Sequence, residues 1–276
     1  MEKGAVTVSA PGKVILAGEH AVVYGYPAIA AAIDRRLIIA VRQGKKSKRY
    51  TGLVEFALSQ ILKPGEVVDL KIKSKLPIGS GLGSSAALAT ALVWALKPSL
   101  SVQAKNRLVK IIEDYQHGQS SGVDQVIVRQ GGMLKFQRGK FKPVKLKVKQ
   151  AILIDSGRPK ETTGEMVKNV AEKKPVTILK KIGQIADNWS PGLIKENEWL
   201  LEQLGVVGQK AQKIIRQIEV IGGMAKVCGA GGIKAGSGML LAHHQDQGKL
   251  LKLIKQKHWR YLKVSLGEPG VRYEKN

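Results

Sequence analysis

Hydrophobic and polar positions change their spacing several times along the chain, and each change predicts a different element. Residues 5–10 and 14–17 form short strand-like runs on either side of Pro11-Gly12-Lys13. Residues 28–33 and 35–42 predict two further strands, followed by a basic loop at 44–50. Helical spacing over residues 51–62 predicts a helix, which stops at Pro64-Gly65.

The middle of the chain mixes both periods. Residues 67–73 alternate as a strand, and the Ala- and Leu-rich run 86–96 predicts a helix. Ser101 is placed to cap a helix that extends to about residue 117, and another helix is expected to begin within 119–124. Strands are predicted at 133–137, 141–149 and 151–155, and the alternating lysines of 142–149 indicate a solvated strand face.

The second half is predominantly helical. Residues 161–220 have helical spacing, broken at Pro175 and at Ser190-Pro191-Gly192. The chain then returns to strand (225–228), glycine-rich loop (229–238), strand (239–242), helix (245–256) and strand (259–266). Strands dominate before residue 150 and helices after it, so we expect domains at 1–150 and 151–276.

Composition limits the class of protein. A chain of 276 residues with 43% apolar residues can bury a sizeable core. It has no run near the roughly 20 apolar residues that span a bilayer, no signal-peptide core, and one cysteine, which together predict a cytoplasmic protein without membrane contact.

The net charge of +25 is unusual. It suits a binder of nucleic acid or an enzyme for anionic substrates. Aromatic residues make up only 5% and are not interleaved with the basic ones, which disfavours a base-stacking surface. We therefore expect most lysines to be solvated, with the charge helping to attract anionic substrates. An association rate of these substrates that does not change with ionic strength would contradict that role.

The stretch Pro77–Ala87 is the first candidate for chemistry. Three glycines at alternate positions let backbone N–H groups approach an anion, and Ser84 and Ser85 open the following helix, whose positive end favours phosphate. The loop lacks the lysine of a Walker loop and the third glycine of a dinucleotide fingerprint. Alone, it fits a tight strand-to-helix turn equally well.

Further residues could also take part in phosphate chemistry. Lys13, after a rigid Pro-Gly pair, could stabilise charge in phosphoryl transfer, and His20 could bond a substrate oxygen. Glu113, at a helix end that disfavours carboxylates, would gain from a magnesium ion shared with Ser85. Asp124 could take a proton from a hydroxyl. In isolation, each of these also fits a surface turn or a solvated carboxylate.

Another glycine loop, Gly229 to Gly238, lies between two predicted strands. It could close over a phosphate or line a substrate pocket, or it could be a flexible hairpin.

Taken together, these segments resemble the GHMP small-molecule kinases, and within them the branch that acts on mevalonate. Ala10–Leu16 with Gly18–Gly25 is similar to the first motif of that branch, and Pro77–Ala87 is similar to the family's ATP loop. Gln116–Asp124 resembles the segment with the catalytic aspartate, and Gly229–Gly232 resembles the third motif. The resemblance spans almost the whole chain in the family's order.

The resemblance implies a two-domain α+β GHMP kinase fold, with an N-terminal half like a ribosomal-protein domain and a ferredoxin-like C-terminal half. Asp124 would be the catalytic base, and Lys13 would make the hydroxyl easier to deprotonate and steady the phosphoryl group. Ser85 and Glu113 would hold Mg²⁺. ATP, the co-substrate, would be wrapped by Gly79, Ser80, Gly81, Leu82, Gly83, Ser84 and Ser85. Mevalonate would contact Glu19, His20, Thr162, Gly229, Ala230 and Gly231.

The chain departs from the family pattern in its third motif, where Ile233-Lys234 interrupts the glycines and Cys228 replaces Thr or Ser. Ala21-Val22-Val23 after Glu19-His20 argues against sugar kinases, which resemble Gly-Glu-His followed by Thr-Asp. Another GHMP kinase, acting on phosphomevalonate or a related hydroxy acid, stays an alternative, as does a basic nucleic-acid-binding protein. A homodimer is left open.

Overall fold

The structure, a computed structural model, describes residues 5–44, 49–118 and 120–275. Its strands, in chain order, are β1 (Val6–Ala17), β2 (Ala28–Gln43), β3 (Val68–Ser74), β4 (Met133–Gln137), β5 (Lys140–Pro143), β6 (Gln150–Asp155), β7 (Met224–Val227), β8 (Met239–His243), β9 (Tyr261–Ser265) and β10 (Arg272–Tyr273). They form two sheets. One is six-stranded, in the order β10-β1-β2-β4-β5 with β3 also on β2, and the other is four-stranded, in the order β7-β8-β6-β9.

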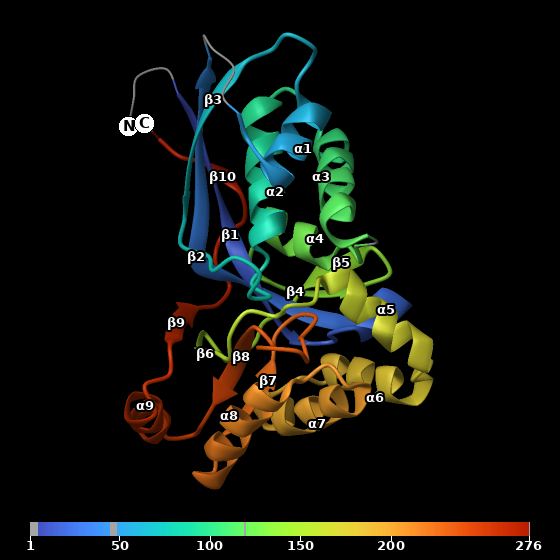
Figure 1. Ribbon diagram of the computed structural model, residues 1–276, viewed down its shortest axis with the longest axis vertical. Helices are drawn as coiled ribbons and strands as arrows, with labels where there is room; N and C mark the ends of the chain where they lie inside the picture. Colours follow the sequence, from blue (N-terminus) through green and yellow to red (C-terminus); the bar gives the residue numbers. More distant parts are fainter. Residues whose placement is uncertain (1–4, 45–48, 119, 276) are drawn as a thin grey trace.

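The helices are α1 (Gly52–Ile61), α2 (Ser84–Leu96), α3 (Val102–His117), α4 (Val123–Gln130), α5 (Thr163–Lys173), α6 (Val176–Asp187), α7 (Ile194–Leu204), α8 (Gln209–Val220) and α9 (Gln247–Gln256), with 3-10 turns η1 (Ala21–Tyr24) and η2 (Pro191–Leu193). Helices α1, α2 and α3 lie together on one side of the long strands β1 and β2, and α5 to α8 gather at the opposite end of the molecule (Figure 1). Mixed helices and antiparallel sheets confirm the predicted α+β class.

Helix α2 is the centre of the N-terminal core. Most of its side chains are buried, and it packs against β1, β2 and α3. An all-round apolar helix of this kind is stable only when it is enclosed on several sides. Its fixed position matters for function because its first residues, Ser84 and Ser85, follow directly from the glycine loop.

The first two strands are longer than predicted. β1 continues through Pro11-Gly12, where the pairing with β2 shifts register, so the predicted break is a bulge rather than a turn. β2 likewise joins the two predicted strands into one. A bulge lets a strand contain a proline without losing its neighbours, because the extra residue need not complete the ladder.

The strand predicted at 141–149 is mostly wrong, since β5 ends at Pro143. Val144, Leu146 and Val148 are partly buried against the core. Their alternation with lysines therefore reflects an extended segment lying on the core without a strand partner over its length. Residues 45–48 of the predicted basic loop, and Gln119 at the expected start of a helix, lie outside the described residues.

The helical second half agrees with its pattern. Helices α5 to α8 occupy the predicted region, with interruptions at Pro175 and at Ser190 to Gly192. Ser101 caps α3 as expected, because its side chain accepts a hydrogen bond from the Ala104 N–H group. In the parts of the chain that are described, no helix has the length and apolar character needed to cross a membrane.

The division at residue 150 stays a prediction, although the two sheets bear on it. All strands of the four-stranded sheet lie after Gln150. The end of the chain then returns to the first sheet, where β10 pairs with β1, and Tyr273 donates a hydrogen bond to the Trp94 carbonyl.

Candidate active site

A cavity of about 580 Å³ brings together segments that are far apart in the sequence. Its walls come from β1 and η1, from the loop before α2, from the end of α3 and the start of α4, from residues 158–163, and from the loop after β7. With the exception of Leu82, every residue predicted to be catalytic or to bind ATP, metal or substrate lines this cavity. The side chain of Leu82 is buried in the core instead, and only its backbone lies in the glycine loop.

The glycine loop has the backbone shape predicted from its sequence. Gly79, Gly81 and Gly83 have φ values of +69°, +83° and +71°, which favour glycine. Gly83 is the N-cap of α2, so the first free N–H groups of that helix open into the cavity beside Ser84 and Ser85. Unpaired backbone donors at a helix start suit a phosphate chain.

Lys13 and Asp124 form an ion pair in the cavity, with Nζ and Oδ2 3.1 Å apart. Lys13 comes from the bulged part of β1 and is 3% exposed, while Asp124 lies in the first turn of α4 and is 29% exposed. The lysine N–H bonds to the Leu82 carbonyl, and its side chain packs against Gly83. One side chain thus links the carboxylate to the glycine loop.

Glu113 lies deeper, at the end of α3, and is 2% exposed. Burial raises its pKa to about 8, with a further contribution from the nearby charge of Asp124, opposed by the Ser85 hydroxyl and by Lys13. Its Oε1 is buried with no hydrogen-bond partner. A buried carboxylate with an orphaned oxygen is a poor arrangement unless a cation completes it.

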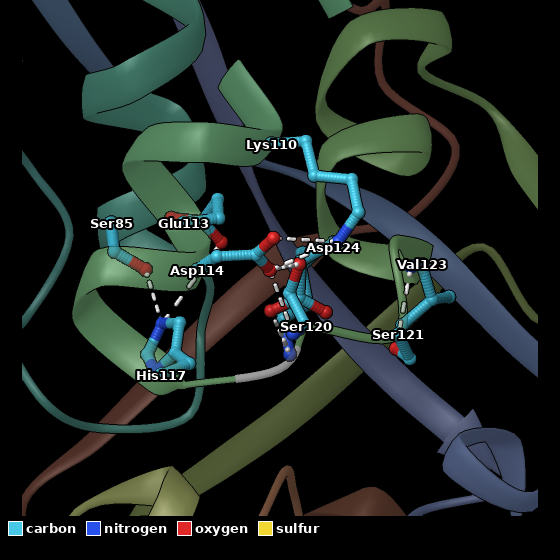
Figure 2. A network of polar contacts seen from close by, with 10 residues as sticks. Ser85, Lys110, Glu113, Asp114, His117, Ser120, Ser121, Val123 and Asp124 are labelled. Carbon is cyan, nitrogen blue, oxygen red and sulfur yellow. Dashed lines mark hydrogen bonds and ion pairs between the residues drawn. The ribbon is translucent and has the colours of Figure 1, made fainter. Parts of the chain in front are cut away.

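Ser85 is next to this carboxylate, and its Oγ lies 3.0 Å from Nε2 of His117 (Figure 2). Burial lowers the pKa of His117, so the ring is neutral at pH 7. Sequence reasoning did not assign His117 a role. Ser85 and Glu113 fit Mg²⁺, which commonly takes one or two protein oxygens and completes its shell with phosphate oxygens and water. Within the described ranges, no set of three or more His, Cys, Asp or Glu side chains forms a metal cage.

A second carboxylate in Figure 2, that of Asp114, is already hydrogen-bonded to other residues. Asp114 accepts hydrogen bonds from Lys110 and from both the backbone and hydroxyl of Ser120 (Figure 2). These partners hold its pKa below the ordinary value, despite some burial that acts the other way. Asp114 therefore secures the turn that leads to α4 and does not line the cavity.

His20 is positioned by strained backbone and by the loop after β7. It has a φ of 58° although it is not glycine, and its Nε2 lies 3.0 Å from the Ala230 carbonyl. Burial lowers its pKa, so the ring is neutral at pH 7. Its other ring nitrogen, Nδ1, is buried without a partner in the described structure. Because the neutral ring donates from Nε2 to that carbonyl, Nδ1 is an acceptor for a hydrogen bond from a ligand hydroxyl.

The loop after β7 meets the ATP loop backbone to backbone. A Cβ on Gly81 would lie 2.5 Å from the Cys228 carbonyl oxygen, and the Met239 N–H bonds to the Ser80 carbonyl. Gly229, Ala230 and Gly231 line the cavity as predicted. Ile233 and Lys234 do not line the cavity themselves, but their backbone N–H groups donate hydrogen bonds to Glu161, which does line it.

Thr162 reaches the cavity rim as the N-cap of α5. Its hydroxyl accepts from the Glu165 N–H and donates to the Glu165 carboxylate, a capping box. The structure thus gives Thr162 a capping role, and contact with a substrate stays a prediction.

Two parts of the cavity were missed by sequence reasoning. Arg158 lies against Gly79, where a Cβ would be 2.9 Å from its Nε, and it adds a cation beside the glycine loop. The other part is an apolar end with unusually exposed side chains, of which Ile72 is 38% and Ile78 73% exposed. It is lined by Leu37, Leu53, Val54, Ile72, Ile78 and Leu88. A flat apolar ligand such as a nucleotide base fits such a surface.

Comparison with known proteins identifies the family of this chain. Residues 49–132 match the family model "GHMP kinases N terminal domain", and residues 2–43 match the "Galactokinase galactose-binding signature". Mevalonate kinase of Thermococcus gammatolerans is 30% identical over 82% of this chain and 86% of its own length. That of Archaeoglobus fulgidus is 33% identical over 81% of this chain and 88% of its own.

A solved structure, the mevalonate kinase of Methanococcus jannaschii, superposes with a TM-score of 0.79 at 25% identity, covering 97% of this chain and 100% of that one. A galactokinase from Lactococcus lactis shares the fold alone, with a TM-score of 0.75 at 16% identity. The chain therefore belongs to the GHMP kinase family, whose members are ATP-dependent small-molecule kinases. Within that family it groups with the mevalonate kinases.

Proposed function

We propose that this chain transfers the γ-phosphoryl group of ATP to the 5-hydroxyl of mevalonate, with Mg²⁺, to give 5-phosphomevalonate. The observation that carries the proposal is the Lys13–Asp124 pair, 3.1 Å long, directly beside a glycine loop at a helix start. A carboxylate to receive a proton, a lysine to balance charge and a phosphate cradle are the parts that phosphoryl transfer to an alcohol requires.

In the proposed reaction, the hydroxyl oxygen attacks the γ-phosphorus while its proton passes to an Asp124 oxygen. The bond between the γ-phosphorus and the bridging oxygen breaks, and ADP leaves. The Lys13 side chain is buried against Gly83 and its ammonium is paired with Asp124, so its charge is already in place as negative charge develops. A magnesium ion held by Ser85 and Glu113 would neutralise charge on the phosphate oxygens.

The end of the cavity lined by His20, which we call the acceptor end because the alcohol would bind there, favours mevalonate over a sugar. Val22 and Val23 line it beside His20. Mevalonate carries a methyl group that can lie against these apolar side chains, whereas a hexose would leave ring hydroxyls without partners there. His20 offers its unpaired Nδ1 to one polar group of the acceptor.

The test is ADP release by the purified protein with mevalonate, phosphomevalonate, homoserine and galactose, each with and without MgCl₂. We expect turnover with mevalonate and magnesium, and little with the other alcohols. Asp124→Asn should lower kcat by roughly 100-fold or more. Asp114→Asn is the matched control, because it removes a nearby carboxylate that lies outside the cavity. Turnover with galactose or phosphomevalonate in place of mevalonate would refute the assignment.

A further inference from the structure

A buried ion pair lies directly behind the acceptor end of the cavity. Lys226 on β7 is 0% exposed, and its Nζ bonds to the carboxylate of Glu19, whose side chain is also 0% exposed. The second carboxylate oxygen of Glu19 accepts a hydrogen bond of 3.2 Å from Nδ2 of Asn197 on α7. Both oxygens of Glu19 are therefore engaged by protein groups.

The ammonium of Lys226 also bonds to two backbone carbonyls, Ile15 at 3.2 Å and Val227 at 3.0 Å. Three acceptors match the three donors of an ammonium group, so its hydrogen-bonding capacity is filled. Burying a charge costs free energy unless it is paired and fully bonded, and this pair meets both conditions.

The bonded segments are those that carry the acceptor site. Ile15 is two residues beyond Lys13 on β1, and Glu19 directly precedes His20. Val227 directly precedes the loop that contains Ala230, the residue whose carbonyl meets His20. One ammonium thus ties residues 15–19, at the end of β1, to β7 in the other sheet.

We propose that Lys226 is a positioning residue for the alcohol substrate. It touches no solvent-accessible part of the cavity, and it acts by holding Glu19, and through it the strained His20, against the loop after β7. The ATP loop is held by different bonds, from Lys13 and Met239 to the carbonyls of Leu82 and Ser80. Loss of the ammonium should consequently displace the acceptor end and spare the nucleotide end.

The proposal deepens the proposed function and rests on it. The test compares Lys226→Met with Lys105→Met, whose lysine is also buried, donating to the Pro98 carbonyl and lying over Trp94, but outside the cavity. We expect Lys226→Met to raise KM for the alcohol roughly 10- to 100-fold, because small displacements cost that much, and to change KM for ATP less than about twofold. Lys105→Met should lower the melting temperature without moving either KM.

Should Lys226→Met fail to fold, Glu19→Gln alone is compared with the double variant Lys226→Met/Glu19→Gln, which leaves no unpaired buried charge. The double variant lacks the bonds to Ile15 and Val227, so KM for the alcohol should still rise relative to Glu19→Gln. Equal effects on the two KM values, or KM values like those of Lys105→Met, would overturn the proposal.

A wild-type protein inactive with mevalonate would refute the proposed function instead. Lys226 would then be tested with whichever alcohol the wild type phosphorylates, by the same comparison of KM values.

Discussion

Glu198 on α7 makes the stability of this protein dependent on pH. Its side chain is 1% exposed, and one oxygen accepts a 2.8 Å hydrogen bond from the Val227 N–H group while Oε1 has no partner. Burial raises the pKa of Glu198 from 4.5 to about 8, against the smaller opposing effects of that hydrogen bond and of Lys226. At neutral pH the folded protein therefore keeps this carboxyl protonated.

The sign follows from proton binding. Between about pH 4.5 and pH 8 the folded state holds a proton on Glu198 that the unfolded state has released, so the free energy of unfolding falls as pH rises. Protonated Glu198 contributes its full stabilisation below the pKa of the unfolded state, 4.5. The contribution is lost once the pH rises past the folded-state pKa of about 8. Each pH unit changes it by about 1.4 kcal/mol, so the whole window amounts to roughly 5 kcal/mol at most.

Urea unfolding at half-unit steps from pH 5 to pH 9, without magnesium, measures this slope in the wild type and in Glu198→Gln. The amide imitates the protonated carboxyl and does not titrate, so the difference between the two proteins isolates Glu198 from Glu113 and the histidines. Glu196→Gln, an exposed position on the same helix, is the control. A wild-type slope unchanged by Glu198→Gln would refute the assignment of a neutral buried carboxyl.

The remaining predictions concern the contact between the two glycine loops. Gly81→Ala, with φ at +83° and the Cys228 carbonyl oxygen 2.5 Å from the new Cβ, should raise KM for ATP roughly tenfold or more. Gly65→Ala is the control, because Gly65 has a similar φ of +85° and no atom lies within 4 Å of the added Cβ. It should lower the free energy of unfolding by only about 1 kcal/mol in urea. Equal effects of the two variants on KM for ATP would contradict the packing argument. Burial raises the pKa of the Cys228 thiol to about 11, so we expect it to react with a chromogenic disulfide about 100-fold more slowly than in urea-unfolded protein. Rapid labelling of the folded protein would show that this loop opens.

Much of the site could be predicted because the local backbone conformation requires particular residue types. Glycine adopts the positive φ of Gly79 and Gly81 without strain, so these positions are visible in the sequence. Arg158 and the apolar end of the cavity could not be found in this way. Their positions depend on which segments fold against the loop, and exposed Ile72 looks like any strand residue until its partners are known.

Glu19 also shows what a local sequence pattern cannot predict. Its place beside His20 predicts a substrate contact, but the structure gives both of its oxygens to Lys226 and Asn197. Those partners follow it by 207 and 178 residues, so no local pattern could reveal them. Whether Glu19 also reaches mevalonate stays a prediction that the Lys226 variants bear on.

The bulge at Pro11-Gly12 explains how a break in the sequence pattern places Lys13 in the cavity. A turn there would have ended β1 and left Lys13 at the surface. Instead the strand continues, and the register shift against β2 sets Lys13 facing Asp124 and the glycine loop. A Cβ on Gly12 would lie 2.3 Å from Leu76 and 3.0 Å from the Leu82 carbonyl, so only glycine lets the loop approach this closely. The same closeness lets the backbone N–H of Lys13 donate to that carbonyl, which fixes the backbone from which the lysine side chain reaches Asp124.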